Sequence, residues 1–122
     1  MNKIDPTVLQ QLGEQLMDYL SQQGYEDFAL YLNDQSWSLC DIRRATHTTA
    51  AGTHYCVREN VSAEEECRFF RSGTVNMIFD GKLYEALNYG NGSVNAALQD
   101  ILRPYDLYFE MGYPFSMTAC PV

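Results

Sequence analysis

Residues 5–24, which read DPTVLQQLGEQLMDYLSQQG, combine a helix-start signal with an amphipathic stripe. Asp5 suits the position before a helix because its carboxylate accepts from unpaired amides, and Pro6 loses no hydrogen bond at the first helical position. The apolar positions recur at steps of three and four, and they are Ile4, Val8, Leu9, Leu12, Leu16, Tyr19 and Leu20. Gly24 suits the helix end. We therefore expect an amphipathic helix over residues 6–23 that lays its leucine stripe on a flat apolar surface.

The residues that follow this helix predict a β-hairpin. Phe28, Leu30 and Leu32 alternate with less apolar neighbours, as in a strand with one buried face. A second short run over residues 37–42 follows the polar connection 33–36. The sheet that these strands begin is the surface that we expect the first helix to cover.

The middle of the chain offers weaker strand signals and one stronger signal. Residues 53–58 and 67–71 are weak candidates, and residues 60–66 between them could form a loop or one helical turn. Residues 74–79 are the stronger candidate, because alternate positions from Val75 onward place large apolar side chains on one face. The positions on that face are Val75, Met77 and Phe79.

The last third of the chain predicts helical segments and a terminal hairpin. Residues 82–88 have helical composition, and Ser93 suits the cap of a further helix that Pro104 ends. Residues 106–111 and 115–120 flank a turn-rich spacer, which is typical of a hairpin.

This order of elements predicts one α+β domain over residues 1–122. Most connections are too short for parallel crossovers, so the sheet should be antiparallel. We expect about five to six strands, with the N-terminal helix and a second helical segment packed on one face.

Two segments, TVNMIFDGKLYEALNYG at residues 74–90 and LYFEMGYPFSMTAC at residues 107–120, resemble uncharacterised small proteins carried on mobile elements of Gram-positive bacteria. The resemblance brings no activity, ligand or catalytic residue with it. What it implies is a mobile-element context for the chain.

The N-terminal residues predict a cytoplasmic protein without a membrane span. They lack the apolar run of a secretory signal, and no window approaches the ~20 apolar residues of a membrane helix. We therefore expect the four cysteines to be thiols rather than disulfides.

The histidines and cysteines do not form a recognised catalytic or metal motif. His47, His54, Cys56 and Cys67 lack the close pairs that a zinc site uses, so we expect no metal or other cofactor. A nucleophilic Cys56 would need His54 or His47 as its base, and one such local pairing is expected by accident. We therefore expect no enzymatic activity.

Charge is the feature that points to a partner class. The chain has 16 acids, 8 Lys plus Arg and a net charge of −8, so nucleic-acid phosphates would repel most of its surface. Nine tyrosines are also many for 122 residues, and tyrosine is favoured in protein interfaces. We expect a non-enzymatic inhibitor, of anti-CRISPR or anti-restriction type, that docks on a basic surface of a nuclease or CRISPR effector. The expected contact residues are Asp18, Glu26, Asp27, Asp34, Tyr105, Tyr108 and Tyr113.

Two alternatives use other features of the chain. A small-molecule binder for a nucleotide signal would hold phosphate with arginine and stack the base on an aromatic ring. Its candidate residues are Arg43, Arg44, Arg58 and Arg71. An immunity or structural partner of a neighbouring gene product would share the interface argument, and its oligomeric state is equally open.

Overall fold

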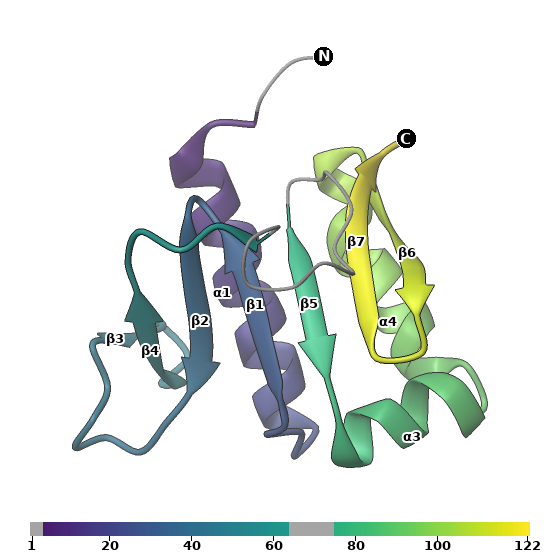
Figure 1. Cartoon of the computed structure of the whole chain (residues 1–122), viewed down its shortest axis with the longest axis horizontal. Coiled ribbons are helices and arrows are strands. Elements are labelled where there is room, and N and C mark those ends of the chain that lie inside the picture. Colours follow the sequence, from purple (N-terminus) through teal and green to yellow (C-terminus); the bar gives the residue numbers. More distant parts are fainter. Residues whose placement is uncertain (1–3, 64–74) are drawn as a thin grey trace.

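The computed structural model describes residues 4–63 and 75–122. It confirms the α+β class: a seven-stranded antiparallel sheet has helices α1 and α4 side by side on one face (Figure 1). The strand order is β3-β4-β2-β1-β5-β7-β6. The expected count of five to six strands was therefore too low.

Helix α1, Pro6–Gln22, confirms the expected N-terminal helix and its start signal. The Asp5 carboxylate accepts a 2.7 Å hydrogen bond from the amide of Thr7, with Pro6 in the first helical position. The leucine stripe is buried against the sheet, and its members are Leu9, Leu12, Leu16 and Leu20. Gly13 is required on this face, because a Cβ there would lie 2.6 Å from the Trp37 ring.

The first hairpin consists of β1, Phe28–Leu32, and β2, Gln35–Leu39. Its turn is shorter than expected: Asn33 and Asp34 both have positive φ, at 51° and 58°, and Gln35 already pairs with Leu32. Two left-handed residues match the twist of the flanking strands, which is why a two-residue turn forms here.

Two more strands extend this side of the sheet. β4, His54–Arg58, confirms the weak candidate and pairs with β2. β3, His47–Thr48, was not predicted, because two residues carry no alternation pattern. It pairs with β4 and forms the edge. The candidate strand over 67–71 lies outside the described residues, as do residues 64–66 of the 60–66 segment.

The other side of the sheet contains β5, Asn76–Phe79, and the terminal hairpin of β6, Leu107–Tyr113, and β7, Ser116–Pro121. These strands confirm the expected positions, and the turn is Pro114–Phe115. The β6–β7 register shifts between Met111 and Tyr113, so Gly112 lies within an irregularity of the strand instead of in the turn.

Helices α3, Gly81–Tyr89, and α4, Ser93–Leu102, connect β5 to the terminal hairpin, with a short 3₁₀ turn, Arg103–Tyr105, after α4. The expected cap by Ser93 was wrong. Gly92, at φ 86°, is the N-cap and contributes no side chain, and the Asn91 amide oxygen accepts from the Ser93 amide at 3.0 Å. An Asn two residues upstream therefore does the capping.

The buried core lies between these helices and one face of the sheet. Trp37 stacks on Tyr55 with ring centroids 4.8 Å apart, and the Tyr55 hydroxyl donates a 2.7 Å hydrogen bond to Glu14 on α1. Other large core side chains include Leu30, Met77, Leu98, Leu102 and Phe109. Within the described residues, no helix has the length and apolarity needed to span a bilayer.

Tyr55 predicts a pH dependence of stability. Burial, followed by the hydrogen bond to Glu14, raises the pKa of Tyr55 well above its ordinary value of 10.0. A raised pKa in the folded state gives stability that is complete below pH 10 and is lost as the pH rises above it. In denaturant unfolding, Tyr55→Phe should be less stable than wild type by about 1 kcal/mol below pH 10, and the difference should shrink at higher pH. A difference independent of pH would contradict this role.

The edge strand β6 is protected by a side chain of α4. The Gln99 amide accepts from the Phe109 amide at 2.8 Å and donates to the Phe109 carbonyl at 2.9 Å, so it bonds both groups that face away from β7. Gln99→Met keeps the size and helix propensity but loses both bonds. It should lower the free energy of unfolding by about 1–2 kcal/mol and promote self-association through the opened edge. Urea unfolding and sedimentation velocity test this, with Gln10→Met on the exposed face of α1 as control.

Candidate partner-binding site

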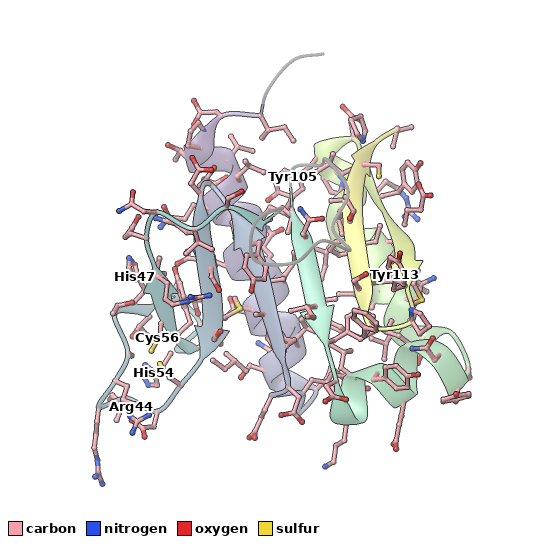
Figure 2. All side chains as sticks on the ribbon, in the orientation of Figure 1. Arg44, His47, His54, Cys56, Tyr105 and Tyr113 are labelled. Carbon is pink, nitrogen blue, oxygen red and sulfur yellow. The ribbon has the colours of Figure 1, made fainter. Side chains whose placement is uncertain are left out.

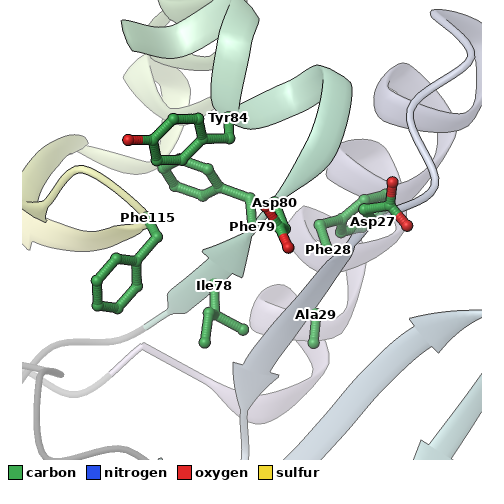
Figure 3. A pocket seen from close by; sticks show the side chains of 8 residues that line it. All are labelled: Asp27, Phe28, Ala29, Ile78, Phe79, Asp80, Tyr84 and Phe115. Atoms are coloured by element: carbon green, nitrogen blue, oxygen red, sulfur yellow. The ribbon is translucent and has the colours of Figure 1, made fainter.

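A pocket of about 470 Å³ opens at the end of the sheet where β1 begins and β5 ends (Figure 3). Ala29 and Ile78, which pair across these two strands, form its aliphatic floor. The carboxylates of Asp27 and Asp80 line it together with the rings of Tyr84 and Phe115. The pocket therefore combines apolar surface, aromatic rings and negative charge.

Backbone hydrogen bonds hold the pocket walls together. The Asp80 amide donates to the Asp27 carbonyl, and the Phe79 amide donates to the Phe115 carbonyl, both at 2.9 Å. The Asn88 side-chain amide of α3 donates to the Pro114 carbonyl at 2.6 Å. Three segments far apart in sequence thus meet at the pocket through these hydrogen bonds.

The two carboxylates differ in what they already bind. Asp80 caps α3 by accepting from the Gly81 amide at 2.8 Å. The Asp27 carboxylate has no hydrogen-bond or ion-pair partner within residues 4–63 and 75–122. Gly81 has φ 55°, and a Cβ there would collide with the Asp27 carboxylate, so glycine leaves room for this carboxylate. Among the described residues, nothing neutralises the Asp27 carboxylate.

A second hollow, of about 770 Å³, lies along α3 and shares Asp80 and Tyr84 with the first. It adds Glu85 and the ring of Tyr89, which is 79% exposed. We call the surface formed by both hollows and the neighbouring Glu26 the acidic end. Its carboxylates are Glu26, Asp27, Asp80 and Glu85, and Lys82 is the one Lys or Arg among the described residues that line the two hollows.

The structure brings together some of the acids expected from sequence. Glu26 and Asp27 are exposed at the acidic end. Asp34 lies at the other end of β1, in the hairpin turn. Asp18 accepts a 2.5 Å hydrogen bond from the Thr49 hydroxyl and is half-buried, so it already has a partner within the fold.

Of the three expected tyrosines, one lies beside the pocket and two lie away from it. Tyr113 is 45% exposed and stacks on Phe115 with centroids 5.7 Å apart, so it borders the pocket. Tyr105 ends the 3₁₀ turn before β6 (Figure 2), and Tyr108 is the second residue of β6, so both are far from Tyr113 at the end of this strand. The Tyr105 hydroxyl donates to Gln15 at 3.1 Å, and the Tyr108 hydroxyl donates to Glu110 at 3.5 Å.

The arginines of the nucleotide alternative do not gather in the described structure. Arg43 and Arg44 are exposed in the connection between β2 and β3. Arg58 is the last residue of β4, whereas His54, the first residue of β4, lies near Arg44 (Figure 2). The strand between His54 and Arg58 is about 13 Å long, so Arg58 is far from Arg44. Arg71 lies outside the described residues. No shared phosphate site of Arg43, Arg44 and Arg58 is formed.

The histidines and cysteines likewise show no catalytic pairing in the described residues. His47 Nδ1 lies 2.9 Å from the Thr46 hydroxyl, and His54 Nδ1 lies 2.9 Å from the Thr48 hydroxyl. The Cys56 thiol contacts Cys40 and the Arg44 carbonyl instead of a histidine. No group of three His, Cys, Asp or Glu suited to a metal ion occurs among the residues described.

Sequence reasoning did not single out Asp80, Tyr84, Glu85 or Phe115 as site residues. Asp80-Gly81 between a strand and a helical segment was a usable signal, because Asp is a favoured helix cap. The proximity of Asp80 to Asp27 and Phe115 depends on strand order, which local patterns do not specify.

No family model matches this chain. No curated protein and no solved structure matches it either.

Proposed function

We propose that this protein is a non-enzymatic binding protein that captures cationic side chains of a protein partner at its acidic end. The observation that carries the proposal is the pocket that the carboxylates of Asp27 and Asp80 line together with the rings of Tyr84 and Phe115 (Figure 3), where the Asp27 carboxylate has no partner among the described residues. A guanidinium group suits this chemistry, because it forms charge-assisted hydrogen bonds with carboxylates and stacks on aromatic faces.

The proposed partner is a cytoplasmic protein that handles nucleic acid, such as a nuclease or a CRISPR effector. The clefts of such proteins present Lys and Arg to phosphates, and the carboxylates of the acidic end would take the place of those phosphates. The net charge of −8 supports the same class of partner, because it would attract the chain to a basic cleft during association. The protein would then act as an inhibitor of anti-CRISPR or anti-restriction type.

Calorimetric titration of the full chain with an arginine-rich peptide tests the proposal. The matched control is the same peptide with citrulline in place of arginine, since citrulline keeps the shape and loses the charge. We expect binding of the arginine peptide that weakens as salt is added, and at least tenfold weaker binding of the citrulline peptide. Equal affinity for both peptides, or no binding of either, would contradict the proposal.

The nucleotide alternative gives a different result in the same assay. It predicts tight binding of a nucleotide and no preference between the two peptides. Such a result would move the site to the Arg43 and Arg44 turn, away from the acidic end.

A further inference from the structure

The thiols of Cys40 and Cys56 lie next to each other on one face of the sheet. Ser38 of β2 pairs with Cys56 of β4, and the pairing continues beyond β2, where the Cys40 amide donates to the His54 carbonyl at 3.4 Å. Cys40, two residues after Ser38, therefore shares the face of Cys56. The two sulfurs are 2.6 Å apart, about half an ångström more than the ~2.05 Å of a disulfide bond.

Both cysteines are free thiols and half-buried, so a small reagent can reach them. The Cys56 thiol also donates to the Arg44 carbonyl at 3.1 Å, which fixes its sulfur beside Cys40. Cys120, the third described thiol, lies on β7, across the sheet from this pair. The arrangement thus selects one pair from the described cysteines.

We propose that Cys40 and Cys56 are a redox-modification site that closes reversibly to a disulfide. The proposed oxidant is a small-molecule disulfide such as glutathione disulfide. This inference does not depend on the function proposed for the acidic end, and it departs from the expectation, made from the sequence, of thiols alone.

The exchange has two steps. The Cys56 sulfur, after losing its proton to solvent, attacks one sulfur of glutathione disulfide, so that a mixed disulfide forms and one glutathione thiolate leaves and takes up a proton. The Cys40 sulfur then attacks the Cys56 sulfur, the bond to glutathione breaks, and the second glutathione leaves with the proton of Cys40. Two protein thiols are oxidised by two electrons in total, and one glutathione disulfide is reduced to two thiols.

The surroundings of Cys40 favour this order of attack. Burial, followed by the hydrogen bond with Cys56, raises the pKa of Cys40 to about 11, so Cys40 stays protonated at neutral pH. A thiol that stays protonated attacks a disulfide slowly, which suits Cys40 to the second step, where it resolves the mixed disulfide on the adjacent Cys56 sulfur.

The bond would close the chain between residues 40 and 56, a segment that includes β3 and the exposed Arg43 and Arg44. A covalent link in a loop of this length restricts the unfolded chain, so it should raise the melting temperature by about 10 °C. The disulfide also removes the Cys56 S–H group, whose hydrogen bond the Arg44 carbonyl accepts. Oxidation would thus link the segment after β2 covalently to β4, and the Arg44 carbonyl would lose its hydrogen bond from Cys56.

Peptide mapping of the full chain tests the proposal directly. Trypsin places the four cysteines in four different peptides, with Cys40 in residues 4–43 and Cys56 in residues 45–58. After oxidation by glutathione disulfide and alkylation of remaining thiols, we expect these two peptides to be linked. Alkylation at both cysteines, a lasting glutathione adduct on Cys56, or a link through Cys67 or Cys120 would overturn the proposal.

Serine variants separate the chemistry from folding. Cys56→Ser can still donate to the Arg44 carbonyl, and it should lose both the link and the rise in melting temperature while its circular dichroism stays unchanged. Cys120→Ser is the matched control and should keep both. A rise in melting temperature of oxidised Cys56→Ser equal to that of wild type would contradict the assigned pair.

Discussion

Removing the carboxylate charges of Asp27 and Asp80 together is expected to lower the affinity for an arginine-rich peptide about 30-fold. Each side chain loses one charge-assisted contact with a guanidinium group, worth about 1 kcal/mol in a site open to solvent, and 2 kcal/mol corresponds to this factor. The variant is Asp27→Asn with Asp80→Asn. Asparagine caps helices as well as aspartate does, so α3 should keep its start at Gly81.

A matched control removes the same charge elsewhere. Asp34→Asn with Asp106→Asn changes two exposed aspartates at positive φ, both 58°, a conformation that asparagine tolerates. Both residues lie away from the acidic end, since neither lines its hollows. Calorimetry should show less than a threefold loss for this control. Equal losses in the two double variants would mean that net charge alone, and not the pocket, binds the peptide.

Replacing Trp37 by alanine is expected to lower the free energy of unfolding by about 3–5 kcal/mol. Trp37 is 1% exposed, stacks on Tyr55 and fills the space left open by Gly13 on α1. Its indole also donates a 2.9 Å hydrogen bond to the Gln35 side chain. Truncation would leave a cavity where α1 meets β2 and β4.

Tyr89→Ala is the control for Trp37→Ala, because Tyr89 is a large aromatic residue that is mostly exposed. Its effect on stability should stay within about 0.5 kcal/mol. Both values can be measured by urea unfolding followed by circular dichroism. Similar losses in both variants would contradict the position of the core described above.

The elements that could be predicted from sequence are those whose signals are local. Asp5 and Pro6 start α1 where expected, and the alternation from Phe28 to Leu32 is a strand. The two residues of β3 have no such signal, since their pairing with β4 alone makes them a strand. Ser93 has a hydroxyl that could cap a helix, but Gly92, at positive φ, occupies the N-cap position. Ser93 is therefore the first residue of the helix.

The candidate site was only partly predictable, for a related reason. Glu26, Asp27 and Tyr113 could be selected as acidic or aromatic residues, and all three lie at or beside the acidic end. Asp18, which has the same charge, turns inward to Thr49. Which acids share a pocket follows from the antiparallel pairing of β1 with β5, and composition carries no information about that pairing.

The redox site and the acidic end can be tested by independent experiments. Peptide mapping tests Cys40 and Cys56 without any partner, whereas the peptide titrations test the acidic end without any oxidant. Failure of one would leave the other standing, because no described residue of the Cys40–Cys56 contact lines the Asp27 pocket.

The most direct test of the central claim is a methyl NMR titration of the isoleucine-labelled protein with the arginine-rich peptide. The chain has four isoleucines, and they report on different places: Ile78 forms the floor of the pocket, Ile42 adjoins the Arg43 turn, and Ile4 and Ile101 lie elsewhere. Binding at the acidic end should shift the Ile78 signal until the site is saturated, while the other three signals move little. A stationary Ile78 signal, or a larger shift at Ile42, would contradict binding at the acidic end.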